Sequence, residues 1–107
     1  MAPASTRITY PTAVVLVALS QGCRYGFEIM DSTGLASGTV YPILRRLEEA
    51  RLLSARWENV TDARDEQRPP RRYYEITGAG RQAVRDAMAR FPGLAGARVP
   101  GISPSPT

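Results

Sequence analysis

Apolar residues recur at helical spacing in the middle of the chain, at i, i+3, i+4 and i+7. They are Val40, Ile43, Leu44 and Leu47. The spacing predicts an amphipathic helix over residues 37–50, with Ser37 as the N-cap because its hydroxyl can accept a hydrogen bond from the first turn. Pro42 falls in the second turn, where a proline removes little of the hydrogen-bond ladder. The side opposite the apolar stripe carries Thr39, Tyr41, Pro42, Arg45 and Arg46.

An earlier helix is predicted to start at Pro11, run to about residue 21 and stop at Gly22. Its centre, residues 13–19, is apolar on every side, so periodicity leaves a buried strand open as the alternative. We prefer a helix that is covered on one side by its own domain and on the other by a second subunit.

Residues 25–32 predict a short helix with Gly26, Ile29 and Met30 facing inward, ended by Gly34. The amphipathic helix over residues 37–50 follows after a short turn. This order of helix, glycine-containing turn and helix is typical of a helix-turn-helix.

After residue 50 the apolar residues recur at every second position, since Leu53, Ala55 and Trp57 alternate with polar residues. This predicts a half-buried strand, and residues 72–76 predict a second one. The polar segment of residues 60–71 between them contains several arginines. Two strands joined by a basic tip, directly after a helix-turn-helix, predict the wing of a winged helix.

Thr77 is expected to cap a last helix whose inward face carries Gly80, Val84, Ala87, Met88 and Phe91. The predicted fold class is α+β, mainly helical: a winged helix-turn-helix with three helices, a two-stranded wing and a C-terminal dimerisation helix. The predicted organisation is a flexible arm over residues 1–10, one domain over residues 11–91 and a disordered tail rich in Pro and Gly over residues 92–107.

The amino-acid composition limits the classes of partner and of catalytic or metal site that the chain could have. With 107 residues the chain is expected to be one domain, and its net charge of +4 and pI of about 9.8 favour a polyanionic partner. Every basic residue is arginine, a bias that suits phosphate and guanine contacts but that we attribute mainly to a GC-rich coding sequence. Histidine is absent and Cys23 is the only cysteine, which excludes Ser-His-Asp catalysis, an internal disulfide and a Cys/His zinc site. No cofactor or metal is expected.

The sequence shows neither a membrane-spanning segment nor a signal-peptide pattern. The longest apolar run, residues 13–19, is far too short to span a membrane, and the first residues lack the pattern of a signal peptide. We therefore expect a soluble cytoplasmic protein without a membrane partner.

Several motifs, taken in order, resemble PadR-family transcriptional regulators. They are the runs at residues 25–29 (YGFEI), 37–48 (SGTVYPILRRLE), 70–74 (PRRYY) and 77–81 (TGAGR). The resemblance implies a winged-helix homodimer that binds a palindromic operator on double-stranded DNA, usually as a repressor, and that a small-molecule effector can release. It also implies dimerisation through the C-terminal and N-terminal helices. The expected interface residues are Val14, Val15, Val17, Ala18, Val84, Ala87, Met88 and Phe91.

The chain departs from this pattern after Phe91, where no long helical domain follows, so it resembles the small subfamily. Some small members bind flat aromatic drugs between tryptophans at the dimer centre. Because the only tryptophan here is Trp57, on the first wing strand, that pocket is not carried over.

The candidate site is the outward face of the central helix together with the wing. The residues expected to contact DNA are Tyr25, Ser37, Gly38, Thr39, Tyr41, Pro42, Arg45, Arg46, Arg68, Arg71 and Arg72. For Tyr25, packing is an equal alternative, and for the central helix a solvated polar face is the competing interpretation. Trp57, Tyr73 and Tyr74 are expected to pack in the sheet and core, and a ligand cage is the less favoured alternative.

Two other classes of function stay open from the sequence. One is a winged-helix adaptor for proteins that has lost DNA binding, and the other is a dimer that binds a ligand without affecting DNA. An enzyme is not expected, because adjacent Glu48 and Glu49 point about 100° apart on a helix and no nucleophile, phosphate loop or metal shell accompanies them.

Overall fold

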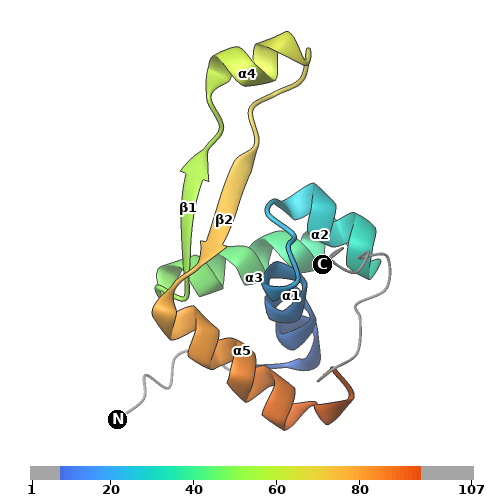
Figure 1. Ribbon diagram of the computed structural model, residues 1–107. Helices are drawn as coiled ribbons and strands as arrows, with labels where there is room; N and C mark the ends of the chain where they lie inside the picture. Colours follow the sequence, from blue (N-terminus) through green and yellow to red (C-terminus); the bar gives the residue numbers. More distant parts are fainter. Residues whose placement is uncertain (1–7, 95–107) are drawn as a thin grey trace, which may run out of the picture.

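The computed structural model describes residues 8–94. Within that range the chain forms a helical body from which a two-stranded wing projects (Figure 1). In chain order the elements are α1 (Tyr10–Ser20), α2 (Gly26–Thr33), α3 (Ser37–Glu49), β1 (Leu53–Trp57), α4 (Val60–Asp65), β2 (Arg72–Ile76), α5 (Gly78–Arg90) and the 3-10 helix η1 (Pro92–Leu94). The predicted fold class is confirmed, with α4 as an addition.

Helix α1 is the centre of the core. Thr9 caps it, since its side-chain oxygen accepts from the backbone N–H of Thr12 at 3.4 Å, and Pro11 lies in its first turn. Residues 10–20 are helical, so the predicted helix is confirmed and the strand alternative is wrong, and residues 12–19 within it are all buried.

The expectation that a second subunit is needed to cover α1 is also wrong. Val15, Val17 and Ala18 have no exposed surface in the single chain, and Val14 is buried too. The apolar character on every side therefore follows from packing inside one chain, where α1 lies against α2, α3, β2 and α5.

The helix-turn-helix consists of α2, a short turn and α3. Gly34 ends α2 with a φ of 78°, in the left-handed region that favours glycine, and its N–H donates to the carbonyl of Met30 at 2.8 Å. Ile29 on α2 and the apolar stripe of α3 are buried together in the core. This packing fixes the orientation of α3, leaving its other side exposed.

The wing is an antiparallel pair whose register runs from Leu53 opposite Ile76 to Trp57 opposite Arg72. Its lower end packs on the body through Leu53, which is buried. Trp57 at the far end is 63% exposed, so the expectation that it packs in the core is wrong. The strand continues beyond the helical body (Figure 1), where its alternating pattern has no core to face.

The polar segment between the strands, for which no helix was predicted, contains helix α4 at the tip of the wing (Figure 1). Asn59 caps this helix, because its side-chain oxygen accepts from the N–H of Thr61 at 2.7 Å. Ala63 is the buried residue of α4.

Helix α5 returns to the body and packs along α1. Thr77 caps it as predicted, accepting from the N–H of Gly80 at 3.0 Å. Gly80 lies so close to the carbonyl of Leu52 that a Cβ at this position would overlap it. The glycine therefore lets the first turn of α5 approach the base of the wing.

The predicted domain limits need adjustment at both ends. Ile8 and Leu94 are partly buried against the core, and Tyr10 already belongs to α1, so the domain extends beyond residues 11–91. The rest of the predicted arm, residues 1–7, and residues 95–107 of the predicted tail lie outside the described residues.

Candidate nucleic-acid interface

Helix α3 has one buried side and one exposed side. Its apolar stripe is buried, as predicted from the spacing. On the opposite side Arg45 and Arg46 are exposed, and neither pairs with a carboxylate anywhere in residues 8–94. Pro42 is exposed beside them, Tyr41 is 43% exposed and Thr39 is half-buried. Two unpaired guanidinium groups on one exposed helix face can bind phosphate or the edge of guanine.

The start of α3 differs from the prediction. Ala36, with extended backbone angles, is the N-cap, and Ser37 is the first helical residue, so its predicted capping role is wrong. The carbonyl of Ala36 accepts from the N–H groups of Thr39 and Val40, each at 2.9 Å. The N–H groups of Ser37 and Gly38 have no acceptor among the described residues, and both residues are exposed. Such a helix end favours an anionic oxygen.

Tyr41 is positioned by α2. Its ring lies over Gly26, and a Cβ at position 26 would overlap the outer ring atoms. The absence of a side chain on Gly26 therefore makes room for Tyr41 at the crossing of the two helices.

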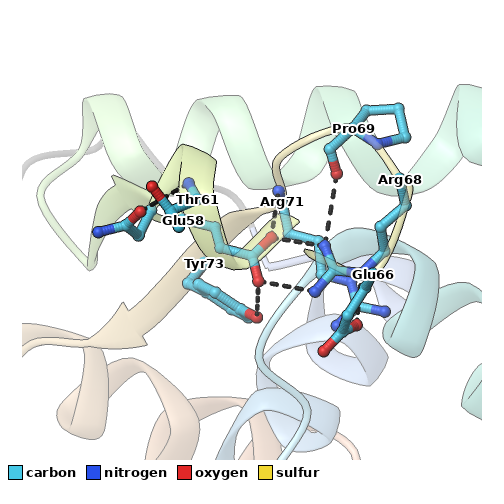
Figure 2. Close-up of polar contacts among 8 residues, drawn as sticks. Glu58, Thr61, Glu66, Arg68, Pro69, Arg71 and Tyr73 are labelled. Carbon is cyan, nitrogen blue, oxygen red and sulfur yellow. Dashed lines mark hydrogen bonds and ion pairs between the residues drawn. The ribbon is translucent and has the colours of Figure 1, made fainter. Parts of the chain in front are cut away.

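Glu58, directly after β1, holds the far half of the wing together. Its carboxylate accepts two bonds from Arg68, the one between Nη2 and Oε2 at 2.7 Å (Figure 2). It also accepts from the N–H of Arg71 at 3.1 Å and from the hydroxyl of Tyr73 at 3.3 Å. The Glu58 side chain is 8% exposed. One carboxylate thus connects β1, the segment after α4 and β2.

The ion pair lowers the pKa of Glu58. The hydrogen bonds from Arg68 are the main cause, and the N–H of Arg71 adds to them, so the carboxyl pKa falls from 4.5 to about 2. The same hydrogen bonds raise the pKa of the Arg68 guanidinium above its ordinary value. Both groups are therefore charged at neutral pH.

This network corrects the expectation for Arg68. Its side chain is 19% exposed and its guanidinium also donates to Glu66 at 2.9 Å, so two carboxylates neutralise its charge. Arg68 is a structural brace for the wing rather than an available cation for phosphate.

Arg71 and Arg72 lie side by side in sequence but have different surroundings. The guanidinium of Arg71 is 4.3 Å from the centre of the Tyr25 ring and pairs with no carboxylate in residues 8–94. The guanidinium of Arg72 donates to Glu48 of α3 at 2.9 Å and stacks on the Trp57 ring at 5.2 Å. Arg71 is thus the more available cation, and Arg72 ties the wing to α3.

Tyr25 connects α2 to the wing. It forms an isolated β-bridge with Tyr73, and the two rings meet edge to face at 5.6 Å. This is the packing alternative weighed for Tyr25, and its half-buried ring remains beside Arg71.

A cleft of about 680 Å³ separates the wing from the first turn of α2 and from Tyr41 in the second turn of α3. We call it the aromatic cleft, because five aromatic side chains contribute to its lining. The lining residues are Tyr25, Gly26, Phe27, Tyr41, Trp57, Arg68, Pro69, Pro70, Arg71, Arg72 and Tyr74. Phe27 is 66% exposed, and neither it nor Trp57 was expected at the site. Trp57 carries the period-two pattern of β1, which predicts packing and not a site, and Phe27 faces outward from α2, whose other side is buried.

The tip of the wing carries mixed charge. Asp62 and Asp65 on α4 and Glu66 after it are exposed, and Arg64 is the exposed cation among them. The available positive charge of the wing therefore lies at the side of the hairpin, near Arg71, and not at its tip.

Neither a reactive thiol nor a metal site is found in residues 8–94. Burial raises the pKa of the Cys23 thiol, which lies 3.6 Å from the hydroxyl of Ser32 in the core. Across residues 8–94 no three His, Cys, Asp or Glu side chains group as metal ligands would. Over the same residues no helix combines the length and the apolar character needed to cross a membrane.

Comparisons with known proteins agree with this geometry. The sequence model of the PadR-like family of transcriptional regulators matches residues 15–86. A PadR-like transcription factor from Bacteroides fragilis is 29% identical, with a TM-score of 0.63 over 79% of this chain and 82% of that one. A PadR family regulator from Eggerthella lenta is 28% identical, with a TM-score of 0.60 over 81% and 79%. One from Clostridium difficile, at 23% identity and a TM-score of 0.64 over 82% and 93%, supports the fold. No curated protein matches the sequence significantly.

A helix-turn-helix with an exposed basic helix, followed by a two-stranded wing, defines a winged-helix protein of the transcription-regulator class. Because the family model matches well over half of the chain, the chain belongs to the PadR-like family of transcriptional regulators. Members of this family are regulators and not enzymes.

Proposed function

We propose that the chain binds double-stranded DNA in a sequence-specific manner and represses transcription as a homodimer on a palindromic operator. The observation that carries the proposal is the exposed face of α3, on which Arg45 and Arg46 have no carboxylate partner in the described residues. A buried apolar stripe on the other side of the same helix holds this face outward.

In the proposed complex α3 enters the major groove, which is wide enough for a helix. Arg45 and Tyr41 face the base edges, with Thr39, Pro42 and Arg46 beside them. The N–H groups of Ser37 and Gly38 approach a phosphate at the start of the helix.

The wing contributes a backbone contact. Arg71 is the cation that reaches a phosphate or the minor groove, because Glu58 and Glu66 neutralise Arg68. Arg72 positions the wing against α3 through Glu48 and adds a weaker contact.

We propose dimerisation through the outer surface of α5 and the ends of α1. Met88 on α5 and Phe91, the residue that follows α5, are half-buried, and Tyr10 meets the Phe91 ring edge to face at 5.4 Å while remaining mostly exposed. The other residues predicted for the interface are already buried in one chain, so they support this surface from below. Those residues are Val14, Val15, Val17, Ala18, Val84 and Ala87.

A homodimer that blocks a promoter would act in the cytoplasm as a repressor, and a small-molecule effector could release it. Two-fold symmetry would place the half-sites about 34–36 Å apart, one helical turn of DNA. Footprinting on the promoter next to the protein's own gene tests this arrangement, with two protected half-sites at that spacing as the expected result.

The control for charge is a second pair of arginines. Arg45→Ala with Arg46→Ala should abolish the footprint, whereas Arg51→Ala with Arg64→Ala removes the same charge from exposed positions outside both α3 and the proposed dimer surface and should preserve it. If both double variants weaken binding equally, net charge and not the α3 face drives the interaction, as expected for an adaptor that has lost sequence-specific binding.

A further inference from the structure

A second groove, of about 510 Å³, lies between the end of α1, β2 and the first half of α5, and no residue of α3 lines it. Leu19, Ile76 and Val84 give it an apolar floor, in which Leu19 and Val84 are buried. We call it the basic groove, because its lining also includes the three arginines Arg24, Arg81 and Arg85. The basic groove thus combines an apolar floor with cationic sides.

The positive charge of the basic groove is not neutralised within the chain. Its three arginines are exposed, and none pairs with a carboxylate in residues 8–94. The guanidinium of Arg24 lies 5.5 Å from the centre of the Tyr73 ring, and Nη2 of Arg85 donates to the side-chain oxygen of Gln82 at 2.7 Å. Neither of these partners is a carboxylate. Among the described residues that line the groove, Glu75 is the one acid against three arginines, so the lining attracts anions.

We infer that the basic groove binds an acidic segment of a partner protein, one that carries apolar side chains between its carboxylates. Clusters of arginine recognise acidic motifs, because each guanidinium can donate two charge-assisted hydrogen bonds to one carboxylate. The apolar side chains of the segment cover the floor of the groove, and their removal from water adds to the affinity.

The lining favours a protein segment over a second nucleic acid. A phosphate backbone carries a charge at every nucleotide and offers no apolar group to cover Leu19, Ile76 and Val84. It would also bring phosphates against the carboxylate of Glu75, whereas a peptide can place an uncharged residue there. A second copy of the chain is disfavoured because each copy carries a net charge of +4.

The basic groove is separate from the contacts proposed for DNA and for the dimer. On β2 the side chain of Arg72 faces Glu48 of α3, and Glu75 faces the opposite side of the sheet because successive strand residues alternate. The ring contact between Tyr10 and Phe91 joins the start of α1 to the end of α5, whereas the groove lies at the other end of both helices. On the proposed function, a partner can therefore occupy the groove while α3 is bound to DNA.

Three peptides test the chemistry of the groove. The probe is a twelve-residue peptide that repeats Asp-Glu-Leu, blocked at both ends and titrated into the full chain by isothermal titration calorimetry. A peptide that repeats Asn-Gln-Leu lacks the charge, and one that repeats Asp-Glu-Ser lacks the leucines. Each of these two should bind at least about tenfold more weakly, because the first cannot form charge-assisted bonds to the arginines and the second cannot cover the apolar floor.

Two double variants locate the site. Arg24→Gln with Arg81→Gln removes two guanidinium groups that line the groove and should weaken the Asp-Glu-Leu peptide by about tenfold or more. Arg51→Gln with Arg64→Gln removes the same charge from exposed positions outside the groove and should bind the peptide as the parent does. Circular dichroism and sedimentation velocity should give the parent's values for both variants. Equal affinity for the three peptides, or an equal loss in the two double variants, would overturn the inference.

The alternative occupants give distinct results. Loss of the peptide in Arg45→Gln with Arg46→Gln, or competition between the peptide and operator DNA, would place the peptide on α3. Peptide affinity that falls as the protein concentration rises would show a second copy of the chain in the groove. A duplex of unrelated sequence that binds the Arg45 and Arg46 variant but not the Arg24 and Arg81 variant would show nucleic acid there. Each of these results would overturn the inference.

The proposed function and this inference can fail separately. A protein that binds the Asp-Glu-Leu peptide through the basic groove but fails to bind operator DNA would keep the inference and overturn the proposed function. A protein that binds the operator but shows no heat of binding at millimolar peptide would overturn the inference and leave the proposed function intact.

Discussion

The ring of Tyr41 lies directly over the Cα of Gly26, at the crossing of α2 and α3. A methyl group at position 26 would overlap the outer ring atoms, which belong to a side chain that is 43% exposed and can rotate away. We predict that Gly26→Ala displaces Tyr41, leaves the free energy of unfolding within about 1 kcal/mol of the parent and weakens operator binding.

Denaturant unfolding and fluorescence anisotropy with labelled DNA separate these two effects. The matched control is Gly78→Ala in the first turn of α5, where an added Cβ meets no atom within 4 Å. A Gly26→Ala protein with unchanged DNA affinity would remove Tyr41 from the proposed interface.

Gly80→Ala, unlike Gly26→Ala, is expected to destabilise the fold. A Cβ there would overlap the Leu52 carbonyl, which is backbone, and would press on Ile76. Because a backbone atom cannot rotate away, Gly80→Ala should lower the free energy of unfolding by about 1–3 kcal/mol. Urea unfolding monitored by circular dichroism measures this, and a variant as stable as Gly78→Ala would show that the first turn of α5 packs less tightly on the wing base.

The ion pair between Glu58 and Arg68, which stabilises the wing, should be lost in acid. Hydrogen bonds from Arg68 lower the pKa of Glu58 from 4.5 to about 2, so the folded wing favours the carboxylate. The stabilisation is complete above about pH 4.5, where the unfolded carboxyl is ionised, and is lost as the pH falls to about 2. Trp57, one residue before Glu58, should report this transition by fluorescence.

Two substitutions test that assignment. Glu58→Gln should make the wing signal at pH 7 resemble that of the parent at low pH. Glu75→Gln on the exposed side of β2 should leave the parent's transition unchanged. An acid transition that persists in Glu58→Gln would have to come from other carboxylates.

Arg45 and Arg71 should differ in the kind of contact they make. Arg45→Ala should relax the preference for the operator over other duplexes if Arg45 reads a base edge. Arg71→Ala should weaken all duplexes alike and reduce the slope of log K against log salt by about one unit. Anisotropy titrations at several salt concentrations measure both quantities, and an exchange of the two behaviours would reverse the roles assigned to the helix and the wing.

The sequence predicted those parts of the fold that a strong period marks. The stripe of α3 was predicted from spacing, and the strand at residues 72–76 and the Thr77 cap were predicted from residue type and position; all three are confirmed. The predicted N-cap at Ser37 was wrong by one residue, because Ala36 has the extended backbone angles of the cap and Ser37 is already helical.

The site was less predictable because its contacts are distant in sequence. Arg68 looked like any wing arginine until folding placed Glu58, ten residues earlier, against it. Trp57 alternated like a buried residue but lies where the wing extends past the body. Helix α4 has six residues, too few for periodicity, and Asn59 with Asp62 was the local signal that could have indicated it.

The most direct test of the central claim is the affinity ratio between operator DNA and a scrambled duplex of equal length at physiological salt. If the exposed face of α3 reads sequence, the parent should prefer the operator by about a thousandfold or more, and Arg45→Ala with Arg46→Ala should reduce that ratio towards one. Equal affinity of the parent for both duplexes would contradict the account.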